Sequence, residues 1–162
     1  MKFIKFEKPS LFLAILLVSF LLRSKQIFEK SVWFDEFLSL EISKLPIRLI
    51  LGGSFYTDSH PPLYYLILKS VTYLGGTELS YRLTALVFSM TSVLVAYLFA
   101  KRLTTNNIAT TFAFLIAIST TFIFYATEIR VYAFLIFCSL LALLACTYDT
   151  SRWRIIGFAA LL

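Results

Sequence analysis

Apolar segments of nearly membrane-spanning length constrain this chain more than any other feature. Four of them, at residues 9–28, 81–100, 108–125 and 131–148, approach the ~20 residues that a helix needs to cross the hydrocarbon core of a bilayer, and a fifth, incomplete one occupies 153–162. Hydrophobic residues make up 59% of the chain and charged residues only 15%, which lies outside the usual range for soluble domains. We therefore predict an all-α integral membrane protein, a multi-spanning helical bundle.

The charges indicate an orientation in the membrane rather than a partner. The formal net charge is +6, but the basic residues are scattered among apolar segments and form no dense basic face, so we expect no binding to nucleic acid. With these crossings, seven basic residues fall on one side, which the positive-inside rule assigns to the cytoplasm together with the N-terminus. They are Lys2, Lys5, Lys8, Lys101, Arg102, Arg152 and Arg154. Arg23, near the end of the first segment, is expected to snorkel to the interface.

The long segment between the first two crossings, residues 29–80, is expected to form an extracytoplasmic loop with two juxtamembrane helices. The spacing of its apolar residues predicts a helix over 34–50, which Pro46 can kink or divide. A second helix is predicted over 62–74, opened by a proline. It is too short to cross a bilayer and has a polar stripe, so it is expected to lie in the interface.

Three groups of polar and ionisable side chains share this outer face. They are Asp35 with Glu36, His60 with Lys69, and Glu128 with Arg130 and Tyr132. Ionisable residues at membrane depth cost free energy, so they are candidates for a functional role. Each group also has an ordinary structural interpretation: acids at a helix N-terminus, a histidine in a turn, charges at a helix end, and a snorkelling lysine. From the residues alone both interpretations stay open.

Four motifs occur in order along the chain. They are Trp33-Phe34-Asp35-Glu36, His60-Pro61-Pro62-Leu63-Tyr64-Tyr65, Arg82-Leu83 at the start of a crossing that closes with Lys101-Arg102-Leu103, and Tyr125-Ala126-Thr127-Glu128-Ile129-Arg130-Val131-Tyr132. In this order and spacing they resemble the N-terminal part of the GT-C superfamily of membrane glycosyltransferases, most closely the dolichyl-phosphate-mannose protein mannosyltransferase and aminoarabinose transferase-like group. The pair Ala126-Thr127 departs from the Ser-Gln of many relatives. The resemblance implies that residues 1–162 form the N-terminal part of one GT-C-like transmembrane domain.

The resemblance also implies an activity. Such an enzyme moves a sugar, with inversion, from a polyprenyl-phosphate-linked donor to a lipid, protein or glycan acceptor on the extracytoplasmic face, here expected to be that of a bacterial or archaeal cell (inner) membrane. Asp35 would be the general base, with Glu36 beside it, because an acceptor hydroxyl is a poor nucleophile until a carboxylate takes its proton. The residues implied in substrate binding are His60, Lys69, Glu128, Arg130 and Tyr132.

Cofactor use and two other functions stay open at this point. No cofactor is certain, although Asp35 and Glu128 offer hard oxygen ligands of the kind that Mg²⁺ or Mn²⁺ prefers. A membrane transporter would use Lys69 and Arg130 to line a permeation path, and would need polar residues at midplane depth and broken helices. An inactive scaffold or fragment would keep the motifs without the activity. Membrane lipids are expected partners in every case.

Overall fold

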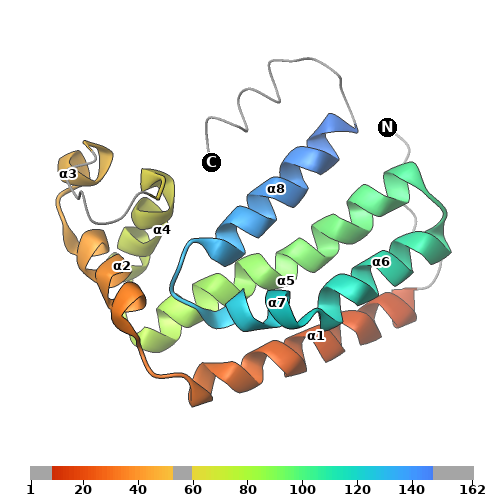
Figure 1. Cartoon of the computed structure of the whole chain (residues 1–162), viewed down its shortest axis with the longest axis horizontal. Helices are drawn as coiled ribbons and strands as arrows, with labels where there is room; N and C mark the ends of the chain where they lie inside the picture. The colour runs from red at the N-terminus through yellow and green to blue at the C-terminus, as the bar shows by residue number, and fades with distance from the viewer. Residues whose placement is uncertain (1–8, 53–59, 148–162) are drawn as a thin grey trace.

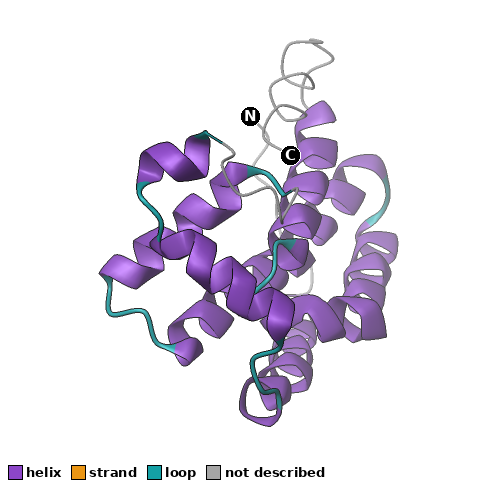
Figure 2. Cartoon of the chain, turned by 60° about the vertical axis from the view of Figure 1, so that its left-hand side comes forward, coloured by secondary structure: helices purple, strands orange, loops and turns teal. Residues whose placement is uncertain are grey.

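The helices are seen in a computed structural model that describes residues 9–52 and 60–147. Within these residues every regular element is helical (Figure 2). The elements are α1 (Pro9–Glu29), α2 (Phe34–Lys44), α3 (Ile47–Leu51), α4 (Pro62–Tyr73), α5 (Glu78–Leu103), α6 (Asn106–Ile118), α7 (Thr120–Phe124), the short 3₁₀ helix η1 (Tyr125–Thr127) and α8 (Tyr132–Cys146). The predicted all-α class is confirmed. The N-terminal lysines and the predicted segment 153–162 lie outside the described residues.

α5 is the central helix of a bundle formed with α1, α6 and α8 (Figure 1). Its 26 residues extend about 39 Å, which exceeds the ~30 Å of a bilayer's hydrocarbon core. α8 packs against α5 through Ala96 and Leu140. α6 packs against α1 and α5 through a fully buried stripe of alanines, Ala109, Ala113 and Ala117. Small side chains at such an interface let helices in a membrane approach closely.

Two of the described helices, α1 and α5, are long and apolar enough to cross a membrane. α6 together with the α7–η1 segment makes a third candidate, but the two parts meet at 53°, so the predicted segment 108–125 is not one straight helix. α8 is apolar but has only 15 residues, fewer than a crossing needs. The chain is an all-α membrane protein, and the side on which its N-terminus lies stays a prediction.

Arg23 of α1 holds the break between α6 and α7. From the sequence we expected this side chain to snorkel to the interface. That prediction is wrong, because the side chain is fully buried in the bundle. Its guanidinium donates to the carbonyl oxygens of Ala117 at 2.7 Å and Ile116 at 3.2 Å, near the end of α6. It also binds the hydroxyls of Ser89 and Ser19. The last carbonyls of a helix have no partner within it, so Arg23 satisfies groups that the break would otherwise leave unpaired in an apolar bundle.

The predicted outer segment folds as α2, α3 and α4 beside one end of α5 (Figure 1). α2 and α4 correspond to the two predicted helices, and α3 is the piece that Pro46 separates, since Leu45 before the proline is extended. α4 opens with Pro62 at its first position, and its 12 residues are too few to cross a bilayer. α2 and α4 pack against each other, which fixes the position of the acidic motif at the start of α2.

Candidate functional site

The first turn of α2 gives two adjacent acids different surroundings. Trp33 precedes the helix with an extended backbone, and the carboxylate of Glu36 accepts a hydrogen bond from the Trp33 backbone N–H at 3.4 Å. A helix turns by about 100° per residue, so the side chain of Asp35 leaves α2 in another direction. Glu36 is fully buried, whereas Asp35 is only partly buried. The two carboxylates therefore cannot play the same part.

Glu36 forms a buried ion pair with Arg82 of α5. Arg82 donates from Nη1 to Oε1 at 3.2 Å and from Nη2 to Oε2 at 3.4 Å, and both side chains are 1% exposed. The backbone N–H of Ile129 gives Oε1 a further hydrogen bond at 2.8 Å. A buried charge is stable only when it is paired and hydrogen-bonded. Glu36 meets both conditions, and its oxygens are occupied.

Arg82 also joins segments that lie far apart in the sequence. It donates to the carbonyl oxygens of Thr127 at 3.0 Å and Lys30 at 3.3 Å, and its Nε binds Glu78 at 2.8 Å. The planar guanidinium carries five N–H donors in a fixed fork, which suits it to such a position. One side chain thus connects the residue after α1, the start of α2, the start of α5 and the end of η1. Sequence reasoning placed Arg82 in a motif but assigned it no role.

Arg130 makes a second connection between α2 and the segment after η1, in addition to the one from the Ile129 N–H. Its Nη1 donates to the carbonyl oxygen of Asp35 at 3.2 Å and to Oγ of Ser39 at 3.0 Å. The two acidic motifs, 93 residues apart at Glu36 and Ile129, therefore meet at one end of the bundle. Among the described residues, the carboxylate of Asp35 has no hydrogen bond and no ion pair.

Glu36, Arg82 and Arg130 form an ionic cluster at this end of the bundle. A pocket of about 460 Å³ opens beside it. It is lined by Glu29, Lys30, Ser31, Trp33, Phe124, Tyr125, Glu128 and Tyr132. The ring centroids of Tyr125 and Tyr132 are 4.6 Å apart, and the ring of His60 meets Tyr132 edge-on at 6.3 Å. Four of the eight lining residues are aromatic and three are charged, and apolar walls that carry a few placed charges are typical of sites that bind small molecules.

Lys30 places a cation in this pocket, and sequence reasoning missed it. Its Nζ donates to the carbonyl oxygen of Phe124 at 2.7 Å, lies 4.0 Å from the centre of the Phe124 ring, and is 3.5 Å from Oε1 of Glu128. The side chain is 23% exposed, so the ammonium can be reached from the pocket. The sequence signal that could have identified Lys30 was its position, two residues after the first apolar segment and five residues before Asp35.

Glu128 brings to the pocket a carboxylate with one unused oxygen. The residue is 3% exposed, and its Oε2 accepts no hydrogen bond from any described residue. Burial raises the pKa of Glu128 above its usual value, although the nearby Lys30 ammonium acts in the opposite direction. A buried acceptor without a partner costs free energy. A ligand hydroxyl or amine that donates to Oε2 would recover part of that cost.

Lys69 lies apart from the residues that the structure brings together. Its ammonium donates to the carbonyl oxygens of Ser43, Lys44 and Leu45 at 3.3, 3.4 and 2.7 Å, at the C-terminus of α2. Ser43 is seven residues beyond Glu36, or about 10 Å along the helix axis. Six of the seven predicted site residues therefore lie in the ionic cluster, line the pocket or contact a residue that does. The seventh, Lys69, instead joins α4 to α2.

Metal binding stays a prediction. Across residues 9–52 and 60–147, no group of three or more His, Cys, Asp or Glu side chains is arranged to hold a metal ion. Of the two candidate ligands, Asp35 has an unengaged carboxylate, while one oxygen of Glu128 faces Lys30. These two acids offer oxygen ligands of the right type for Mg²⁺ or Mn²⁺. Two carboxylates fill only part of the coordination sphere, so water or substrate would supply the remaining ligands.

The fold and the site together define an all-α membrane protein with an ionic cluster and an aromatic pocket at one end of its bundle. A family model described as "Dolichyl-phosphate-mannose-protein mannosyltransferase" matches residues 59–161, which is more than half of the chain. The chain belongs to this family and is, at the level of the family, a glycosyltransferase of the GT-C type. Searches of curated proteins and of solved structures gave no match.

The match bears on the predicted residues unequally. It contains His60, Lys69, Glu128, Arg130 and Tyr132, together with Arg82. It begins after the motif that carries Asp35 and Glu36. The link between that first motif and the matched region is the set of hydrogen bonds that Arg82, Ile129 and Arg130 make to α2.

Proposed function

We propose that the chain transfers a sugar, with inversion, from a polyprenyl-phosphate-linked donor to an acceptor on the extracytoplasmic face of the membrane. The family supports glycosyl transfer. The observation that carries the proposal is the contrast between neighbouring acids: every oxygen of Glu36 is engaged, and the carboxylate of Asp35 is not. Glu36 holds the site together, and Asp35, the residue just before it in the chain, is left to take a proton.

In the proposed reaction Asp35 is the general base. It accepts the proton of the acceptor hydroxyl while the hydroxyl oxygen forms a bond to the anomeric carbon of the sugar. The bond from that carbon to the phosphate oxygen breaks, and polyprenyl phosphate leaves with the electron pair. Glu36 does not exchange protons in this scheme. It keeps the first turn of α2 against Arg82 and Ile129, and so fixes the position of Asp35.

The leaving phosphate and the sugar need partners of different chemistry. The phosphate gains negative charge as the bond breaks, and fixed cations stabilise that charge. Arg130 and Lys30 supply cations here, with His60 as a further donor beside Tyr132. Glu128 is proposed to accept a hydrogen bond from a sugar hydroxyl through its unused oxygen. Lys69 enters the proposal only through α2, whose C-terminus it holds.

Transport is the alternative for which the structure offers an observation. Arg23 is buried within α1 and the neighbouring span is broken, and both features occur in permeation pathways. However, Arg23 is fully buried, and its donors are bound to Ser19, Ser89, Ile116 and Ala117. A guanidinium that is used to close the gap between helices does not line an open path, so glycosyl transfer is the better supported function.

Replacing Asp35 by asparagine tests the proposal. The variant keeps the size of the side chain and removes the base, so transfer of mannose from polyprenyl-phosphate mannose, measured on the complete chain in membrane vesicles, should fall by about 10²–10⁴-fold. Glu41→Gln, which changes an exposed acid on the same helix, is the matched control and should retain activity. Unchanged transfer by a normally expressed Asp35→Asn variant would refute the assignment.

A further inference from the structure

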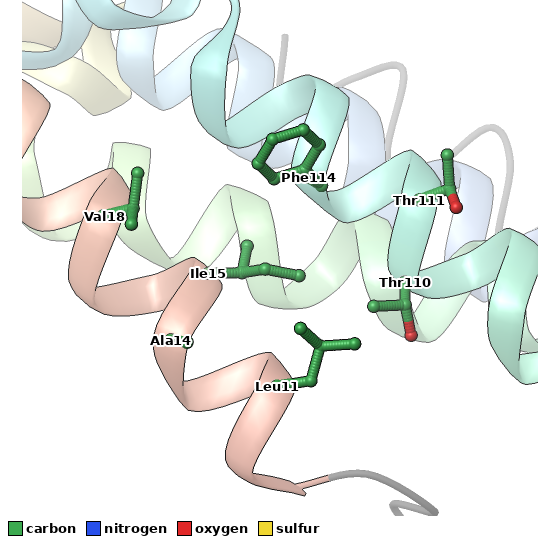
Figure 3. A pocket seen from close by; sticks show the side chains of 7 residues that line it. All are labelled: Leu11, Ala14, Ile15, Val18, Thr110, Thr111 and Phe114. Atoms are coloured by element: carbon green, nitrogen blue, oxygen red, sulfur yellow. The ribbon is translucent and has the colours of Figure 1, made fainter.

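A second pocket lies between α1 and α6, in the half of α1 away from the candidate site. It has a volume of about 320 Å³ and is lined by Leu11, Ala14, Ile15, Val18, Thr110, Thr111 and Phe114 (Figure 3). The four residues of α1 follow one another at intervals of three, one and three positions, so they form a single face of that helix. The lining thus describes a groove that runs along two neighbouring helices.

The groove offers hydrocarbon but little hydrogen bonding. The Thr110 hydroxyl donates to the carbonyl oxygen of Asn106 at 2.8 Å, and the Thr111 hydroxyl donates to that of Asn107 at 3.0 Å. Neither hydroxyl proton is therefore available to a ligand. Leu13 of α1, next to the groove residue Ala14, is 64% exposed, and α1 is apolar enough to cross a membrane. Lipid chains are the surroundings that such a surface requires.

The two ends of the groove differ in polarity. One helical turn before Thr110, Asn106 accepts a hydrogen bond from the Tyr97 hydroxyl at 3.5 Å, and the Lys101 ammonium donates to the same hydroxyl at 3.4 Å. The ring of Tyr97 packs at 4.6 Å against Phe12, the residue that follows Leu11. A cation is thus held by a hydrogen-bonded network beside the end of the groove where the helices leave the apolar region.

Beyond the opposite end of the groove, α1 and α6 are joined directly. Beyond Val18, Arg23 of α1 binds the carbonyl oxygens of Ile116 and Ala117 of α6 and joins the two helices directly. From Leu11 to Val18 the groove extends about 10 Å, whereas one leaflet contributes about 15 Å of hydrocarbon. Its length therefore matches part of one chain in one leaflet.

We propose that this groove binds an acyl chain of an anionic phospholipid whose headgroup phosphate lies at Lys101. The apolar lining accepts the chain, the junction that Arg23 makes between α1 and α6 limits it to one leaflet, and the Lys101 ammonium complements the headgroup charge. The site is separate from the proposed sugar-transfer site and does not depend on it. Bound lipid would fill the space between α1 and α6 and so support the broken span that Arg23 holds.

The test uses the complete chain reconstituted in phosphatidylcholine vesicles that contain a trace of phosphatidylglycerol with a photoactivatable acyl chain. We expect labelling to concentrate in residues 11–18 and 110–114. The same photoactivatable chain on phosphatidylcholine should label this groove less well. Ala14→Trp, which fills the groove, should remove most of that labelling, whereas Leu13→Trp, on a neighbouring face of α1, should leave it unchanged. Lys101→Gln should reduce the preference for phosphatidylglycerol by about fivefold, the effect of one basic residue beside an anionic surface.

Several outcomes would overturn the proposal. Labelling spread evenly over all lipid-facing residues of α1 would show contact with bulk lipid only. Equal labelling by both probes would remove the role of the anionic headgroup. Absence of lipid labelling in the groove, with cross-links to another protein segment or a second copy, would identify a different occupant. Circular dichroism of each variant shows whether its helices are intact, and Val18→Trp serves as the second groove-filling variant if Ala14→Trp does not fold.

Discussion

Breaking the buried pair between Glu36 and Arg82 should destabilise the chain strongly. Arg82→Met keeps an apolar stem but removes every N–H donor. The Glu36 carboxylate then stays buried with backbone N–H groups alone, and the carbonyl oxygens of Thr127 and Lys30 lose their donor. Removal of one partner from a buried pair costs about 3–5 kcal/mol. For a chain of this size, 4 kcal/mol corresponds to a fall of roughly 8–16 °C in Tm.

The measurement is thermal unfolding of the complete chain in detergent micelles, followed by circular dichroism. The double variant Glu36→Met with Arg82→Met should recover part of the loss, because replacement of both members of a buried pair by apolar side chains is often neutral. Lys44→Met, which removes an exposed partner of Glu41, is the control and should cost less than about 1 kcal/mol. If Arg82→Met behaves like this control, or if the double variant costs as much as both single variants added together, the pair does not hold the site as described.

Two further replacements separate electrostatics from substrate binding. Because the pKa of Glu128 is raised in the folded chain, its contribution to stability is present below the usual carboxyl pKa and lost as pH rises through the raised value. Glu128→Gln should therefore melt at a higher temperature than the unchanged chain at about pH 7 but at the same temperature at about pH 4; a difference independent of pH would contradict the raised pKa. Lys69→Met leaves three carbonyl oxygens at the end of α2 without their donor and should cost about 1–3 kcal/mol with KM for the sugar donor unchanged. A higher KM at normal stability would instead favour the substrate-binding role predicted from the sequence.

Features set by local chemistry were predictable from the sequence. Runs of apolar residues located α1, α5 and α8, Pro62 marked the start of α4, and Pro46 marked the division between α2 and α3. The motifs that contain Asp35-Glu36 and Glu128-Ile129-Arg130 were expected to share one face, because each follows an apolar segment that ends on the same side of the membrane. The structure brings them into direct contact through the Ile129 N–H.

Features set by partners distant in sequence were not predictable. Neither proline nor glycine marks the break at Ser119, and the carbonyl groups at the end of α6 are satisfied by Arg23, 94 residues before Ala117. Lys69 resembled a snorkelling lysine or a phosphate ligand until α4 was placed against the end of α2. Lys30 belongs to the pocket only because the segment after η1 returns to the end of α1.

The arrangement also explains why two adjacent acids are needed where one base suffices for the proposed chemistry. A catalytic carboxylate at the start of a short helix is only as well placed as that helix, and α2 has 11 residues, too few to be stable alone in water. Glu36 supplies the missing anchor by binding Arg82 of the long central helix and the backbone N–H of Ile129. Since that anchor uses both oxygens, the same side chain cannot also serve as an unhindered base. The division of work between Asp35 and Glu36 thus follows from hydrogen-bond capacity, and it predicts that Glu36 variants lose activity through misplacement of α2 while Asp35 variants lose it with the fold intact.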